Sequence, residues 1–246
     1  MAFQPKFPFS RSEDLSGWDV PRTRWLDSQA AQGTMLNGLM TSAIVFDTDQ
    51  ERRRILLLKR AAHDSMPNRW EPPGGGVDAE DASILNACAR ELYEEAGLVA
   101  TRVVREVVEG RRTFKNRTGE RVFVAVVFEV EVCNDDEMGE DDQRSSGDGI
   151  SGRTGERGED SQRSEDGIPV RTGERSEKTE VELRVKLDHN EHSAWRWATE
   201  EEVRREKMMG QDKDGKTVIL GDMPITDRHV RDMLLGEFAK KRSQIA

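Results

Sequence analysis

Short apolar runs separated by polar turns dominate the pattern of the first half of the chain. Residues 39–47 and 54–61 are apolar and β-prone, and the turn-like sequence between them predicts that they pair as two strands. Residues 101–109 and 121–132 are also strand-like, and residues 115–120 contain the Asn and Gly that a hairpin turn needs. These runs predict the strands of a mixed β-sheet.

An apolar stripe at helical spacing predicts a helix after the glycines at residues 74–76. The stripe consists of Ile84, Leu85, Cys88, Leu92 and Ala96. Asp78 is the expected N-cap, with Asp81 three residues later, and Gly97 is the expected glycine that ends the helix. The two prolines before the glycines are incompatible with a helix there, so the triple glycine is expected to form a loop.

The second half of the chain predicts further regular elements. Residues 181–187 alternate between apolar and polar side chains, which is typical of a strand. Trp195 and Trp197 are expected to be buried against the sheet, and Thr199 is expected to cap a helix that begins at Glu200. The sequence after residue 210 faintly resembles a calcium loop, but its glycine falls at the wrong spacing and a turn explains it.

The two ends of the chain differ in pattern. Residues 1–33 contain prolines and scattered aromatic residues without a sustained period. This predicts an extension that lies on the domain surface through its aromatics, with a peptide or partner contact as the alternative. Near the other end, Thr226 is the expected cap of an amphipathic helix that closes the domain. Its apolar face consists of Val230, Met233, Leu234 and Phe238. We therefore expect one domain over residues 34–240 and a tail over residues 241–246.

Residues 134–180 interrupt this domain with Asp, Glu, Arg, Ser and Gly and almost no apolar side chain. A degenerate repeat that begins at Gln143 returns at Gln162. Such a segment cannot bury enough surface to offset its ordering entropy, so it is expected to be a disordered insertion. RNA binding is disfavoured because acidic residues cancel the arginine charge and aromatic residues are absent. An interaction protein whose repeat does the work is an open alternative.

Composition and charge narrow the classes of partner and compartment. The net charge of -10 argues against binding to nucleic-acid polymers or anionic membranes, because both are polyanions. The N-terminus lacks a continuous apolar segment, and no run of about 18 apolar residues occurs, so neither a signal peptide nor a membrane span is expected. Two cysteines, Cys88 and Cys133, give no disulfide framework. The expected location is the cytoplasm, with the nucleus as an alternative.

Three carboxylates lie beside the apolar stripe of the predicted helix. At about 100° per residue, Glu91, Glu94 and Glu95 fall within an arc of roughly 100°. Without compensation they repel one another, at a cost of about tenths of a kcal/mol for each exposed pair. Hard oxygen ligands in this number suit Mg²⁺, with Mn²⁺ as an alternative. The sequence therefore predicts a divalent metal site in which Arg90 orients the carboxylates.

The stretch from Gly76 to Leu98 resembles the Nudix box, G-x5-E-x7-R-E-U-x-E-E-x-G-U, in which U is aliphatic. The sequences REL at 90–92, EE at 94–95 and GL at 97–98 occupy the box positions at the family spacing. Ala82 departs from the pattern, because the family has its first glutamate there. Glu80 and Asp81 stand just before it, and we expect both to favour the helix start rather than to bind metal.

This resemblance implies a fold and a reaction. The implied fold is an α/β/α sandwich, with the box helix and a C-terminal helix packed on the mixed sheet. The implied activity is Mg²⁺-dependent hydrolysis of a nucleoside diphosphate linked to another moiety, with a small-molecule diphosphate as the substrate. Glu91, Glu94 and Glu95 are the implied metal ligands, and Glu94, Glu95 and Arg90 the implied catalytic groups. No motif outside the box selects the substrate.

Residues outside the box complete the expected site. Glu191 is similar to the family's acidic residue that precedes a tryptophan, which implies a metal ligand or a general base. His189 and His192 flank it, but without an accompanying cysteine they are expected to be surface histidines. Arg60 ends a predicted strand, where the family often places a basic residue facing the substrate phosphates; a solvated strand end is the alternative. Gly74, Gly75 and Gly76 are expected to shape the substrate-binding loop.

Ala82 leaves two functional classes open. Loss of a glutamate that supports the metal shell or pairs with the box arginine would weaken metal binding, while the triad of carboxylates is intact. We expect an active hydrolase. The alternative is a catalytically silent Nudix-fold module that binds a nucleotide or a partner.

Overall fold

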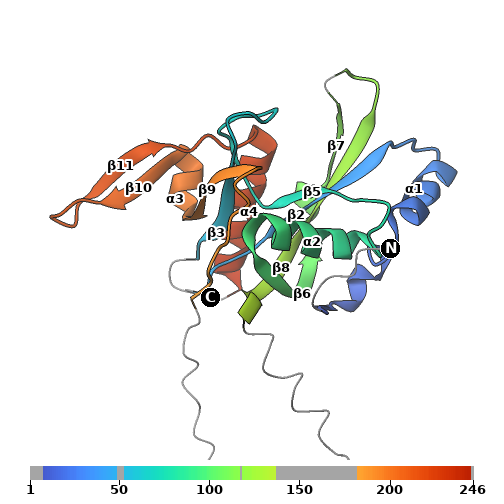
Figure 1. The fold of residues 1–246 in the computed structure, drawn as a ribbon, viewed down its shortest axis with the longest axis horizontal. Helices are drawn as coiled ribbons and strands as arrows, with labels where there is room; N and C mark the ends of the chain where they lie inside the picture. Colours follow the sequence, from blue (N-terminus) through green and yellow to red (C-terminus); the bar gives the residue numbers. More distant parts are fainter. Residues whose placement is uncertain (1–7, 49–52, 117, 137–181, 245–246) are drawn as a thin grey trace, which may run out of the picture.

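The computed structural model describes residues 8–48, 53–116, 118–136 and 182–244 (Figure 1). Apart from its first three residues, the predicted insertion at 134–180 lies outside the described residues. No helix within the described ranges is long and apolar enough to cross a bilayer.

The main sheet is mixed, as the sequence predicts. Its strands run in the order β1 (Ser10–Arg11), β6 (Leu98–Glu106), β8 (Val122–Asn134), β2 (Gly38–Ile44) and β5 (Gly74–Gly76), and β7 (Arg112–Lys115) also pairs with β8. β2 runs parallel to β8, whereas β5 is antiparallel to β2 and β6 is antiparallel to β8. The predicted hairpin turn is confirmed by the antiparallel pairing of β7 with β8.

Two smaller sheets flank it. In one, β3 (Ile55–Arg60) lies between β4 (Trp70–Glu71) and β9 (His192–Ala198), and in the other β10 (Lys207–Gln211) pairs with β11 (Thr217–Asp222). The predicted pairing of residues 39–47 with 54–61 is wrong for most of their length. Both edges of β2 are occupied by β5 and β8, so only the ends of the runs bond, as in the 3.0 Å hydrogen bond from the Leu56 amide to the Val45 carbonyl.

The helices are α1 (Arg22–Ala31), α2 (Ile84–Ala96), α3 (Glu200–Arg205) and α4 (Arg228–Ser243), with short 3₁₀ turns at Glu13–Gly17 and Val108–Gly110. α2 ends at Gly97 as predicted, with φ of 66°. Its N-cap is Ser83, whose hydroxyl accepts the Asn86 amide, and the prediction of Asp78 is wrong. Thr199 caps α3 as predicted.

At α4 the cap is displaced by one residue. Asp227 caps it by accepting the Val230 amide at 2.9 Å, and the prediction of Thr226 as the cap is wrong. The Thr226 hydroxyl instead donates to the Trp70 carbonyl at 3.1 Å. The predicted apolar face of α4 is confirmed, because its residues Met233, Leu234 and Phe238 are buried.

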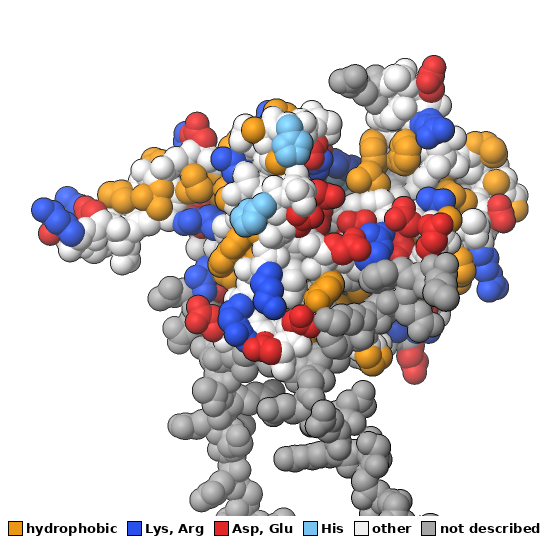
Figure 2. Space-filling model, in the orientation of Figure 1, with side chains coloured by type: hydrophobic (Ala, Val, Ile, Leu, Met, Phe, Trp, Pro, Cys, Tyr) orange, Lys and Arg blue, Asp and Glu red, His pale blue; other side chains and the backbone are white. Residues whose placement is uncertain are grey.

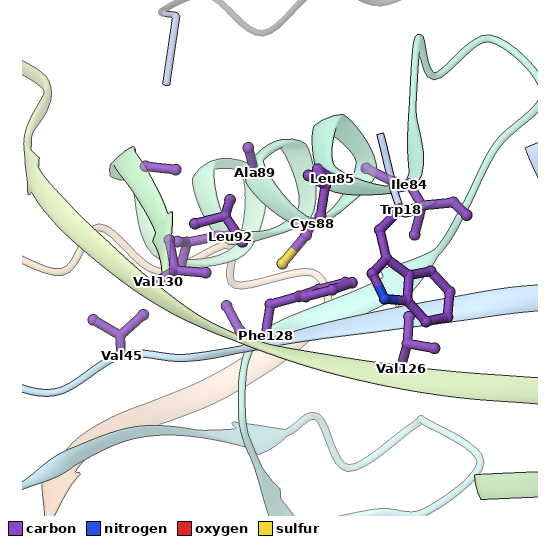
Figure 3. Close-up of a cluster of buried hydrophobic side chains, with 14 of the residues drawn as sticks. Trp18, Val45, Ile84, Leu85, Cys88, Ala89, Leu92, Val126, Phe128 and Val130 are labelled. Atoms are coloured by element: carbon purple, nitrogen blue, oxygen red, sulfur yellow. The ribbon is translucent and has the colours of Figure 1, made fainter. Parts of the chain in front are cut away.

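Two apolar clusters sandwich the strands between α2 and α4. Successive strand side chains point to opposite faces, so Leu56 and Leu58 of β3 join the cluster under α2, while Ile55 and Leu57 join the cluster under α4. Figure 3 shows Cys88 and Leu92 of α2 pointing toward Phe128 of β8. The fold is therefore α/β with a mixed sheet between helices, as predicted.

The N-terminal segment contributes to the core instead of only lying on it. Leu15 is 1% exposed and Trp18 is 7% exposed, and both belong to the cluster under α2. Trp18 stacks on Trp25 of α1 at 5.5 Å between ring centroids. The aromatic residues thus anchor this segment, but they do so within the hydrophobic core.

The chain after the predicted insertion bonds to α2 rather than forming the strand predicted at 181–187. The Lys186 amide donates to the Ala96 carbonyl at 2.8 Å, so the end of the helix takes a donor that a neighbouring strand would need. The Asn134 side chain, at the end of β8, also binds this segment. It accepts the Arg184 amide at 2.8 Å and donates to the Glu182 carbonyl at 3.0 Å.

β9 places its two tryptophans differently. Trp197 is half-buried against the cluster under α2, whereas Trp195 is 41% exposed, so the expected burial of Trp195 is wrong. Trp195 lines an open recess together with Lys186 and Leu187.

Candidate functional site

Glu95 is fixed between the last turn of α2 and β5. Glu95 is 4% exposed, and its Oε2 accepts a hydrogen bond from the Gly74 amide at 2.7 Å. Gly74 has φ of +154°, and a Cβ there would lie 2.2 Å from the Thr41 carbonyl oxygen of β2. Only glycine allows this strand to approach so closely. The predicted glycine loop is therefore wrong: residues 74–76 form a strand that holds a carboxylate.

Glu91 lies one turn earlier on α2, against the same strand. A Cβ on Gly75 would lie 2.5 Å from its Oε2, so the glycine leaves space for the carboxylate. Gly76 differs, because a Cβ there would meet nothing within 4 Å, and its role is to accept the Arg90 Nη2 at 2.9 Å through its carbonyl. At Gly74 and Gly75, therefore, a larger residue would clash with the site, whereas at Gly76 it would not.

Arg90 is the buried cation around which the acidic groups gather. Its Nη1 donates to Glu91 and to Glu94 at 2.8 Å each. Asp81, 2% exposed, accepts its Nε at 2.9 Å and its Nη2 at 3.0 Å. The expectation that Asp81 serves the helix start is wrong, because α2 begins after Ser83 and the carboxylate binds Arg90. The sequence did offer one signal for this contact, because Asp81 is an acidic residue directly before Ala82, where the family has a glutamate.

Burial makes two of these carboxylates costly to ionise. Desolvation raises the pKa of Glu95 to about 9, against the Gly74 hydrogen bond and with added repulsion from neighbouring carboxylates including Glu91. Desolvation also raises the pKa of Glu91 to about 7, against the charge of Arg90. A divalent cation would remove this cost, so the pair favours cation binding.

Glu191 and His192 reach the same place from beyond the described gap. The Asp188 amide donates to the Glu95 carbonyl at 3.1 Å, and the His192 amide donates to the Asp188 carbonyl at 2.9 Å. One ligand atom from each of Glu95, Glu191 and His192 lies within 4.8 Å of the others. Glu191 is exposed, at the open side of the group.

His192 is not the surface histidine that the sequence predicts. It is 3% exposed, and its Nδ1 lies 3.9 Å from the Glu95 Oε1. Burial, followed by the charge of Arg60, lowers the pKa of His192 to about 4. His189 is exposed as expected. The burial of His192 arises from its position as the first residue of β9, opposite Arg60, which no local pattern indicates.

The remaining candidates lie at the margin of the group. The Glu94 side chain is 49% exposed and is tied to the helix by Arg90. Arg60 is half-buried, and its guanidinium is bound by Asp64 at 2.6 Å and by Glu71. Its charge is thereby shared between two carboxylates. Figure 2 shows the acidic side chains gathered over α2 on one face of the molecule.

Comparison with known proteins gives partial matches. The NUDIX domain family model matches residues 38–148, which include β5 and α2 but end before Glu191. The RNA pyrophosphohydrolase of Bartonella tribocorum (strain CIP 105476 / IBS 506) is 43% identical over 54 residues, 22% of this chain and 30% of that protein. The human m7GpppN-mRNA hydrolase NUDT17 is 34% identical over 98 residues, 38% of this chain and 25% of that protein.

The matched segment therefore spans about a third or less of either curated relative. Among solved structures, a MutT protein from Methanosarcina mazei Go1 superposes with a TM-score of 0.44 at 18% identity, covering 83% of this chain and 94% of that one.

Proposed function

Residues 38–148 belong to the Nudix hydrolase family, and on this premise we propose that the protein is a divalent-metal-dependent hydrolase of diphosphate linkages. The substrate would be a nucleoside diphosphate joined to a second moiety. The observation that carries the proposal is the convergence of Glu95 and Glu191 beside Glu91, from two distant parts of the chain. Carboxylate oxygens in this number fit Mg²⁺ or Mn²⁺.

Glu91, Glu94, Glu95 and Glu191 would hold the ion. When bound, a divalent ion supplies a Lewis acid that neutralises phosphate oxygens and lowers the pKa of a bound water. Glu95 has its Oε2 occupied by the Gly74 amide, so its Oε1 is the atom available to a ligand.

The protein groups divide the remaining work. The Arg90 Nη1 donates to Glu91 and to Glu94 at 2.8 Å each, so a residue of the same helix would orient both carboxylates. Glu191 is the exposed carboxylate of the group, and its oxygen that does not hold the ion would accept the proton of the attacking water.

The contact between Asp81 and Arg90 supports an active enzyme over a silent binding module. The alternative rests on Ala82, which removes a carboxylate that can pair with the box arginine. In this chain Asp81 makes that pair through two hydrogen bonds, of 2.9 and 3.0 Å. The ordering of Arg90 therefore does not depend on a glutamate at position 82.

A substrate screen with Mg²⁺ and with Mn²⁺, scored for released mononucleotide or phosphate, tests the proposal. The screen should include nucleoside diphosphate sugars, dinucleotides, oxidised nucleotides and, because two relatives are named for them, RNA and m7GpppN-capped RNA. Glu95→Gln should reduce turnover by about 100-fold or more. Glu80→Gln, at an exposed carboxylate of the preceding loop, is the matched control and should turn over normally. Wild-type turnover by Glu95→Gln would refute the assignment.

A further inference from the structure

The His192 imidazole has a buried nitrogen that the carboxylate site does not account for. Among the described residues, its Nδ1 is one of a small group of buried side-chain polar atoms that have no hydrogen-bond partner. The residue is 3% exposed, so bulk water does not compensate the atom. A buried polar atom without a partner costs about 1–3 kcal/mol, so a ligand beside Nδ1 would remove this cost.

This nitrogen faces the carboxylate group. The Nδ1 lies 3.9 Å from the Glu95 Oε1, too far for a hydrogen bond. One imidazole nitrogen of His192 lies within 4.8 Å of a ligand oxygen of Glu95 and of Glu191. A metal ion lies about 2.0–2.2 Å from imidazole nitrogens and carboxylate oxygens, so an ion between these atoms would contact all of them after small side-chain shifts.

The backbone holds the three side chains in this arrangement. The segment that carries Glu191 and His192 is bonded to α2 through the Glu95 carbonyl. It is also bonded to the residue that follows β3, because the Ala61 amide donates to the Glu191 carbonyl at 2.8 Å. The candidate ligand atoms therefore come from α2, from the first residue of β9 and from the turn just before it, which is held by these backbone hydrogen bonds.

We propose that His192 Nδ1, together with Glu95 and Glu191, forms a mixed nitrogen and oxygen metal site that prefers a first-row transition ion to Mg²⁺. The inference rests on the proposed metal site but not on hydrolysis. Imidazole nitrogen is a borderline-soft ligand that suits first-row transition ions such as Co²⁺ and Zn²⁺. Mg²⁺ prefers oxygen ligands and usually retains several of its water ligands. The nitrogen thus sets the metal preference of a site that is otherwise built of carboxylates.

Calorimetric titration of the metal-free full chain with Co²⁺ and with Mg²⁺, without substrate, tests the site directly. Wild-type protein should bind Co²⁺ at least about tenfold more tightly than Mg²⁺. His192→Gln should lose about tenfold or more in Co²⁺ affinity and change the visible Co²⁺ spectrum, while its Mg²⁺ affinity changes little. His189→Gln, at the exposed histidine of the same segment, is the matched control and should bind both ions normally.

Equal Co²⁺ affinity in His192→Gln and the wild type would overturn the proposal and leave Nδ1 bridged by water. If His192→Gln does not fold, pulsed electron paramagnetic resonance of Mn²⁺ bound to the wild type decides. Coupling to an imidazole nitrogen is expected, and its absence overturns the inference. Nitrogen coupling without turnover in the substrate screen would instead refute the proposed hydrolase and leave this site standing.

Discussion

The Asp81 carboxylate binds the Arg90 guanidinium through two hydrogen bonds, with Oδ1 2.9 Å from Nε and Oδ2 3.0 Å from Nη2, and both residues are buried. Arg90 in turn binds Glu91 and Glu94. A carboxylate that the Nudix pattern places at position 82 is thus supplied from position 81. Asp81 acts through Arg90 and is a positioning residue.

Asp81→Ala should therefore destabilise the protein and weaken its metal binding. We expect a loss of about 2 kcal/mol in the free energy of unfolding, because Arg90 loses its buried partner but keeps Glu91 and Glu94. The double variant Asp81→Ala with Ala82→Glu returns a carboxylate to the box position. Urea unfolding and Mn²⁺ titration should show recovery in the double variant. If it is no better than Asp81→Ala, the exchange of positions 81 and 82 is wrong.

The glycines of β5 should respond differently to the same substitution. In Gly74→Ala the new Cβ meets the Thr41 carbonyl oxygen at 2.2 Å, so β5 must move and Glu95 loses its amide donor. We expect destabilisation of about 3 kcal/mol or more and loss of metal binding. Gly76→Ala adds a Cβ in open space and should change stability by less than about 0.5 kcal/mol. Urea unfolding of both variants measures the contrast, and similar losses would contradict it.

The metal-free protein should become less stable as pH rises from about 5 to about 9. Glu91 and Glu95 have their ordinary pKa of 4.5 in the unfolded chain, but about 7 and about 9 in the folded protein. Their raised folded values contribute stability that is present below the unfolded pKa and is lost as pH rises through the folded one. At about 1.4 kcal/mol per pKa unit, the two shifts together set an upper limit of about 10 kcal/mol on this loss.

Thermal unfolding of the wild type and Glu95→Gln across this pH range isolates the contribution of Glu95. The variant should have the flatter profile, because its amide does not titrate. Saturating Mn²⁺ should flatten the wild-type profile, since the ion stabilises the ionised carboxylates. Parallel profiles for the two proteins without metal would show that Glu95 does not ionise with a raised pKa.

We propose that the site does not need the part of the predicted 134–180 insertion that follows Asp136. Replacing residues 137–181 with a short Gly/Ser linker should preserve the fold, the Mn²⁺ affinity and turnover, because Asn134 already binds the chain at Glu182 and Arg184. Calorimetry and the substrate screen measure the outcome. Loss of activity with the fold retained would favour the alternative in which the repeat is the working part.

Sequence patterns predicted the features that depend on a few neighbouring residues. The stripe from Ile84 to Ala96, the end of α2 at Gly97 and the cap of α3 at Thr199 are local, and the structure has all three. The cap of α2 was misassigned because Asp78 and Ser83 are both good caps, and a pattern of neighbouring residues does not distinguish them.

Features that depend on distant parts of the chain were not accessible. The apolar run of β2 does not indicate that β5 and β8 occupy both its edges, which separates it from β3. Residues 181–187 alternate like a strand, yet the Lys186 amide donates to the end of α2 and the Arg184 amide to the Asn134 side chain. His192 is buried because β9 pairs with β3, so its proximity to Glu95 arises only from the assembled fold.

The Asn134 side chain joins the two chain segments on either side of residues 137–181, so the protein could be divided between them. Glu91, Glu94 and Glu95 precede Asn134, and Glu191 and His192 follow the chain that it binds. A cut within 137–181 would therefore leave each fragment with part of the proposed metal ligands. Each fragment alone would lack a complete metal site. Metal binding would then require the two fragments to associate. The divided protein would serve as a split reporter in which metal binding signals that association.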